Sequence, residues 1–173
     1  QTVYADREGS VAAPTAGLHF TPQLLAALRA NGVRLGTLDL EVGPGTFKPV
    51  EADRLSAHVM HPERFHITAD LSRAVAETRT GGGKVWAVGT TVARALEAAA
   101  ERGGQVRATN EETRLFIAPG YKFRVVDRLI TEGSDGEGSA SSASRLADSV
   151  EQALKLGGGT VLVDVEGEGE RLY

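Results

Sequence analysis

Residues 84–102, KVWAVGTTVARALEAAAER, contain a compact apolar strand, a tight turn and an alanine-rich helix in direct succession. Residues 84–88 have the length and the apolar character of a buried strand, and Gly89-Thr90-Thr91 follows as the turn. The helix expected over 92–102 places Val92 and Leu96 on one face. A strand, a turn and a helix in this order predict one β/α unit of a larger sheet.

Helices and strands alternate on both sides of this unit. Thr21 is a suitable N-cap, Pro22 occupies the first helical position, and Asn31-Gly32 supplies a stop, so a helix is predicted between them. A second helix is expected over residues 69–79. Apolar runs predict strands over residues 33–42, 64–68, 114–118 and 123–131. This alternation favours an α/β sheet or barrel.

The last part of the chain differs in composition. Residues 132–144 consist mainly of Gly, Ser, Asp and Glu without a large apolar side chain, which is typical of a flexible loop or linker. A helix over 144–156 and a short strand over 160–165 are expected after it. We therefore divide the chain into an α/β portion at 1–131, a linker at 132–144, and a terminal helix and strand at 145–173.

Composition narrows the class of protein. The 173 residues include 41% hydrophobic and 24% charged side chains, which suits one globular domain. No run of about 18 apolar residues is present and the first ten residues are too polar for a signal peptide, so we expect a cytoplasmic protein. The lack of cysteine excludes disulfides and thiolate chemistry. A formal charge of -4 gives no global attraction to RNA, so any RNA contact must be local.

A first candidate site lies at residues 14–22, PTAGLHFTP. Its small residues permit a close approach of the backbone, and His19 stands just before a helix start, where free N–H groups attract a carboxylate or phosphate. His19 could donate, accept or shuttle a proton. Packing or capping by His19 within the loop is the alternative.

Two glycine turns follow predicted strands. Residues 42–47, VGPGTF, end one strand, and ligands gather at the carboxyl ends of strands in α/β sheets, although the Rossmann and P-loop spacings are absent. In the other turn, the hydroxyls of Thr90 and Thr91 suit a ribose or a carboxylate, and Arg94 could clamp an anion. The alternatives are a plain tight turn in the first case, and a simple N-cap with a surface arginine in the second.

Two histidines and a carboxylate occur together in residues 58–63, HVMHPE. His58, His61 and Glu63 are residue types that bind zinc or iron. The histidines lack the i, i+4 spacing that puts two imidazoles on one helix face. We therefore favour a polar loop that contacts a ligand or stabilises the structure, and we expect no metal.

In their order along the chain, these motifs closely resemble the S-adenosylmethionine:tRNA ribosyltransferase-isomerases of queuosine biosynthesis. The resemblance spans residues 1 to about 131. The stretches that carry it are QTVYA (1–5), GSVAAPTAGLHFTP (9–22), VGPGTFKPV (42–50), HVMHPE (58–63), AVGTTVARALE (87–97) and LFIAPGYKFRVVD (115–127).

The resemblance implies a barrel-like (TIM-like) β/α domain, incomplete in this chain, with tRNA and S-adenosylmethionine as substrates. The reaction it implies transfers the ribosyl part of S-adenosylmethionine to a 7-aminomethyl-7-deazaguanine base in tRNA and isomerises it to epoxyqueuosine, releasing adenine and methionine. By position, His19 is the acid/base candidate, with His58 and His61 as second choices. The candidate substrate-binding residues are Thr15, Gly17, Gly43, Gly45, Thr46, Thr90, Thr91, Arg94 and Tyr121, the last as a ring that stacks on a base.

The chain departs from the family pattern in two places. Glu41 stands where the family has a histidine, and residues 132–137, EGSDGE, replace an Asn-Phe-His-Leu-Pro block. The family is also about twice as long, with an upstream part of the barrel and a small inserted β-domain. Two other interpretations therefore stay open: a relative that binds a nucleoside or S-adenosylmethionine without turnover, and an unrelated α/β enzyme that acts on sugars or nucleotides.

Overall fold

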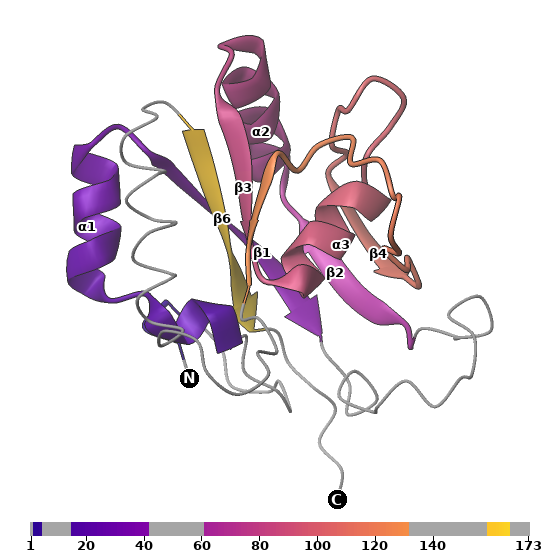
Figure 1. Ribbon diagram of the computed structural model, residues 1–173, viewed down its shortest axis with the longest axis horizontal. Helices are drawn as coiled ribbons and strands as arrows, with labels where there is room; N and C mark the ends of the chain where they lie inside the picture. Colours follow the sequence, from indigo (N-terminus) through magenta and orange to yellow (C-terminus); the bar gives the residue numbers. More distant parts are fainter. Residues whose placement is uncertain (1, 5–14, 42–60, 132–158, 167–173) are drawn as a thin grey trace, which may run out of the picture.

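The computed structural model describes residues 2–4, 15–41, 61–131 and 159–166 of the chain, the last segment as backbone (Figure 1). Its elements, in chain order, are a short 3-10 helix η1 (Thr15–His19), α1 (Pro22–Ala30), β1 (Arg34–Glu41), β2 (Glu63–Ile67), α2 (Ala69–Thr80), β3 (Lys84–Val88), α3 (Thr90–Ala98), β4 (Thr109–Thr113), β5 (Arg128–Ile130) and β6 (Gly159–Glu166).

One mixed sheet of six strands organises these elements. The strand order is β4-β2-β1-β6-β3-β5. Strands β1, β6, β3 and β5 run parallel, whereas β2 is antiparallel to both β1 and β4. This arrangement confirms the α/β class. The expected barrel does not close within the described residues, because β4 and β5 each pair on one side only and leave an open sheet.

Helices cover both faces of the parallel part of the sheet, with α1 on one side and α2 and α3 on the other (Figure 1). Strand β3 shows why both faces must be covered. Val85 and Ala87 belong to the core beneath α2 and α3, whereas Trp86 and Val88 belong to the core beneath α1 and η1. Side chains alternate across a strand, so an apolar strand without polar positions requires apolar neighbours on both faces.

The helices form where local sequence signals predict them. Thr21 accepts a hydrogen bond from the backbone N–H of Leu24 (3.1 Å) and caps α1, as expected from the sequence. Thr68 caps α2 in the same way through the N–H of Leu71 (3.2 Å). Helix α3 begins at Thr90 and ends at Ala98, before the predicted end at Arg102.

One strand prediction was wrong and another was too long. Residues 114–118 form no strand, since the preceding polar residues of β4 pair with β2 instead. Of residues 123–131, only 128–130 form a strand. The backbone N–H groups of residues 124–126 are bound by the carboxylate of Glu97, so these residues pair with a side chain instead of a neighbouring strand.

The strand expected at residues 160–165 is present as β6, and it lies between β1 and β3. The terminal strand is therefore part of the central sheet. The predicted linker at 132–144 and the predicted helix at 144–156 lie outside the described residues. Among the helices that are described, none combines the length and the apolar character needed to cross a bilayer.

Candidate functional site

The carboxyl ends of the parallel strands meet at one edge of the sheet, which lies at the bottom of Figure 1. β2 also begins there, because it is antiparallel to β1 and its residue Arg64 pairs with Glu41 at the end of β1. η1 packs against the same edge through Ala16, whose cluster includes Val88 and Ile130 at the ends of β3 and β5. We call the assembly of η1, Gly89–Thr91 and His61–Glu63 the carboxyl edge.

Close packing at η1 explains one glycine of the first motif. A methyl group at Gly17 would collide with the Tyr4 hydroxyl oxygen and would come within 3.1 Å of the Thr2 methyl carbon. The lack of a side chain at Gly17 therefore leaves room for the Tyr4 hydroxyl. Thr15 is exposed on η1, and His19 is half-buried at its end.

The turn after β3 leaves the start of α3 without a side-chain cap. Gly89 occupies the N-cap position with φ 98, a conformation that favours glycine, and its N–H donates to the carbonyl of Ile130 (2.8 Å). Glycine has no side-chain oxygen, so residue 89 cannot cap the helix. The first N–H groups of α3 therefore point toward the carboxyl edge without a side-chain acceptor from the N-cap. Thr90 is exposed and Thr91 is half-buried beside them.

Arg94 lies one turn further along α3 and is buried, with 6% of its surface exposed. Its Nη1 pairs with Oε2 of Glu63 at 2.6 Å, and its Nε donates to the carbonyl of Leu115 at 2.7 Å. The surface arginine considered in the sequence analysis is thus a buried cation that ties α3 to the start of β2. Its Nη2 is buried without a hydrogen-bond partner.

The remaining predicted residues are dispersed. His61 is exposed two residues before Glu63, at the carboxyl edge. Tyr121 is half-buried near the C-terminal half of α3, where its hydroxyl donates to Oε2 of Glu97 at 3.3 Å. Gly43, Gly45, Thr46 and His58 lie outside the described residues. In the described ranges, no group of three or more His, Asp or Glu side chains is placed to hold a metal ion.

Glu41, the departure from the family pattern, is the last residue of β1. Its carboxylate lies 3.8 Å from the guanidinium of Arg64, and both side chains are about half exposed, so this is a weak surface pair. Glu41 is therefore at the carboxyl edge, next to the start of β2.

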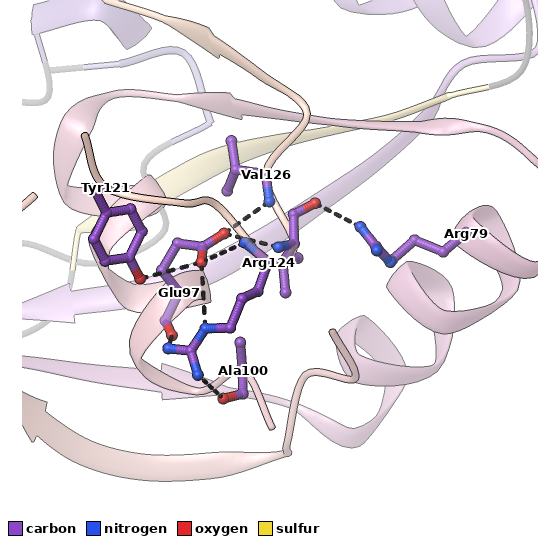
Figure 2. A network of polar contacts seen from close by, with 7 residues as sticks. Arg79, Glu97, Ala100, Tyr121, Arg124 and Val126 are labelled. Atoms are coloured by element: carbon purple, nitrogen blue, oxygen red, sulfur yellow. Dashed lines mark hydrogen bonds and ion pairs between the residues drawn. The ribbon is translucent and has the colours of Figure 1, made fainter. Parts of the chain in front are cut away.

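Sequence reasoning missed Glu97, whose carboxylate is fully buried. One oxygen accepts from the N–H groups of Val125 (2.8 Å) and Val126 (2.9 Å), and the other accepts from the N–H of Arg124 (2.9 Å) (Figure 2). One feature of the sequence could have identified Glu97. It follows the apolar Leu96 on an alanine-rich helix, and an acidic side chain that is buried in such a helix needs hydrogen-bond partners.

Comparison with known proteins agrees with the resemblance found in the sequence. Residues 1–134 match the family described as queuosine biosynthesis protein. The chain is 54% identical over 131 residues to an S-adenosylmethionine:tRNA ribosyltransferase-isomerase of Pelotomaculum thermopropionicum, covering 76% of this chain and 38% of the relative. Proteins of the same name from Trichlorobacter lovleyi (52% over 131 residues) and Burkholderia mallei (56% over 135 residues) show the same coverage of both chains.

The chain thus spans 38% of the length of these relatives. The family match covers η1, the turn after β3 and the start of β2, which together make up the carboxyl edge. It also includes Arg94, Glu97 and the segment that Glu97 binds. On the residues matched and the identities observed, this chain belongs to the queuosine biosynthesis protein family.

Proposed function

We propose that this chain supplies part of an S-adenosylmethionine:tRNA ribosyltransferase-isomerase. The reaction transfers the ribosyl part of S-adenosylmethionine to a 7-aminomethyl-7-deazaguanine base in tRNA and isomerises it, giving epoxyqueuosine with release of adenine and methionine. The observation that supports it best is that η1, the turn after β3 and the start of β2 lie together where the carboxyl ends of the parallel strands meet. Ligands of α/β sheets bind at that edge.

The start of α3 is suited to the carboxylate of the methionine moiety. Gly89 provides no side-chain cap, so the first N–H groups of α3 can donate to an anion, and the positive end of the helix dipole adds to the attraction. Thr90 and Thr91 offer hydroxyls for the same carboxylate or for the ribose. Arg94 would act here mainly by positioning, since Glu63 already neutralises it.

His19 is the proposed acid/base residue. The positive sulfonium of S-adenosylmethionine acidifies the neighbouring C5′ hydrogens of the ribose, so a positioned base can begin the reaction and an acid can assist the departure of adenine. His19 ends η1, which packs at the carboxyl edge through Ala16. His61 and His58 are second choices, and Thr15, Gly17, Gly43, Gly45 and Thr46 would shape the surface that the substrate approaches.

The proposal extends to the context of the chain. In the longer relatives, further strands beside β4 and β5 would complete the barrel-like domain. The protein would act in the cytoplasm, where tRNA is modified, and would need no metal.

Adenine release tests this function. The purified chain is mixed with S-adenosylmethionine and tRNA that carries the aminomethyl-deazaguanine base, and adenine is measured by chromatography. We expect release that His19→Ala lowers by about 100-fold or more, the usual range for loss of an acid/base group. His66→Ala is the matched control, because His66 pairs with Asp39 on β1 and should leave release unchanged. A folded chain that releases no adenine would show that these residues do not turn over alone and would favour binding without turnover, and release that is unchanged in His19→Ala would contradict the proposed role of His19.

A second candidate is binding without turnover. It is favoured by the engagement of Arg94 with Glu63 and by the loss of the Asn-Phe-His-Leu-Pro block after Thr131. This candidate predicts that S-adenosylmethionine raises the melting temperature of the chain while adenine release stays at background.

A further inference from the structure

Residues 121–124, Tyr-Lys-Phe-Arg, place aromatic and basic side chains in alternation on one exposed segment. Phe123 is 44% exposed, which is high for a large apolar side chain. Its ring meets the ring of Tyr121 edge to face, with centroids 5.2 Å apart and planes at 78°. An exposed, oriented aromatic ring beside cations is typical of surfaces that bind single-stranded nucleic acid.

The backbone of this segment is held in place from beneath. Glu97 accepts hydrogen bonds from three consecutive N–H groups at residues 124–126, and its second oxygen also accepts from the Tyr121 hydroxyl (Figure 2). Arg79 adds a hydrogen bond to the carbonyl of Val125 (3.0 Å). A surface fixed in this way loses little conformational entropy when a partner binds.

The charge at this segment is positive although the whole chain carries -4. Lys122 is exposed, and the Arg124 side chain is 47% exposed while it donates to the carbonyls of Glu97 (3.0 Å) and Ala100 (3.2 Å). The opposing carboxylate of Glu97 is fully buried. Phosphates that approach from solvent would therefore meet Lys122 directly, whereas the charge of Arg124 is already balanced by the Glu97 carboxylate 3.9 Å from its Nε.

We propose that residues 121–124 form an RNA-contacting surface, with a base stacked on Phe123 and a phosphate against Lys122, beside the partly exposed side chain of Arg124. This inference rests on the proposed tRNA substrate and specifies where the chain contacts it. The surface lies beside the C-terminal half of α3, and Glu97 is about 10 Å along the helix from its start at the carboxyl edge. It therefore binds nucleotides other than the one that reacts.

The test measures the affinity of the 173-residue chain for a fluorescently labelled tRNA anticodon stem–loop by anisotropy, over a series of salt concentrations. We expect Phe123→Leu to weaken binding about tenfold, because leucine keeps apolar bulk but has no ring on which a base can stack. Phe123→Trp keeps an aromatic ring and should bind RNA about as well as wild type. Lys122→Gln should weaken binding and lower the salt dependence by about one phosphate contact. Arg29→Gln, an exposed change on α1, is the control and should leave the affinity unchanged.

Three results would overturn this surface. The first is equal binding by wild type, Phe123→Leu and Lys122→Gln, and the second is wild-type chain that binds no RNA. In the third, Phe123→Trp binds as weakly as Phe123→Leu and Lys122→Gln leaves the salt dependence unchanged, which would mean that neither base stacking nor phosphate contact holds RNA at this segment. The proposed function is judged separately by adenine release, so either proposal can fail without the other.

Discussion

Tyr4 and Gly17 lie so close together at η1 that the hydroxyl of Tyr4 fills the space where a side chain at residue 17 would begin. Gly17→Ala should therefore destabilise the fold by about 1–3 kcal/mol, the usual cost of overpacking. The measurement is the free energy of unfolding in urea. In a Tyr4→Phe background, which removes the colliding oxygen, the same substitution should cost less. An equal cost in both backgrounds would show that Tyr4 is not the cause.

Arg94 and Glu63 form a buried pair at the carboxyl edge, with side chains 7% and 1% exposed. Arg94→Met should lower the free energy of unfolding by about 3–5 kcal/mol, because it leaves a buried carboxylate without its cation. The double variant Arg94→Met/Glu63→Met should recover most of this loss. Chemical denaturation of the three variants checks the prediction, and a double variant no more stable than the single would contradict it.

At this scale the sequence predicted the residue types at the carboxyl edge but not their partners. Thr90 and Thr91 follow β3 after a single glycine, so their place could be inferred from the strand and turn alone. Arg94 could not be assigned, because its partner Glu63 belongs to a different strand far away in the sequence. Glu97 was missed for the same reason, since its partners at 124–126 are brought to it by the fold.

At the scale of the elements, α1 depends on its N-cap. Thr21→Ala should lower the free energy of unfolding by about 1 kcal/mol, because the N–H of Leu24 loses its acceptor. For a chain of this size that corresponds to a fall of roughly 2–4 °C in melting temperature. Thr21→Ser keeps the hydroxyl and should melt close to wild type, whereas equal melting of the Ala and Ser variants would argue against the cap.

The start of β4 has a pH-sensitive contact. A hydrogen bond from Arg107 lowers the pKa of Glu111 below its ordinary value of 4.5, with help from the Thr109 hydroxyl. A carboxyl whose pKa is lower in the folded state stabilises the fold above its unfolded pKa and loses this effect as pH falls through its folded pKa. Wild type should therefore be slightly more stable than Glu111→Gln at pH 6.

This advantage should disappear at a second pH, chosen below the folded pKa of Glu111. It should also shrink in high salt, because the pair is exposed. Denaturation of both proteins at the two pH values checks this. An advantage that persists at low pH would mean that Glu111 acts through packing and not through its charge.

The elements that sequence reasoning predicted correctly are those with local signals. Helices α1 and α2 carry threonine caps and end near glycine, and β3 is a short apolar run between glycines, so neighbouring residues suffice to define them. β4 was missed because its five residues, TNEET, have no apolar pattern and form a strand only by pairing with β2. Such an edge strand depends on the fold that surrounds it.

At the scale of the whole molecule, β6 joins the two halves of the sheet. It pairs with β1 on one side and with β3 on the other, and those two strands do not pair with each other. The full chain should therefore unfold in urea in one cooperative transition, and a chain that stops after residue 158 should not. A chain that stops after Glu166 keeps β6 and serves as the control. Cooperative unfolding of the shorter chain would show that the two halves of the sheet hold together without this strand.

β6 lies beyond residues 1–134, the part that matches the family, yet it occupies the centre of the sheet. The hydrogen bonds of strand pairing come from the backbone and do not depend on which side chains the strand carries. The place between β1 and β3 is thus a slot that a separate peptide could occupy, as in a split protein reassembled from two pieces. The stability of the family-matching part would then rise with the concentration of that peptide, because the peptide binds the folded state and not the unfolded state.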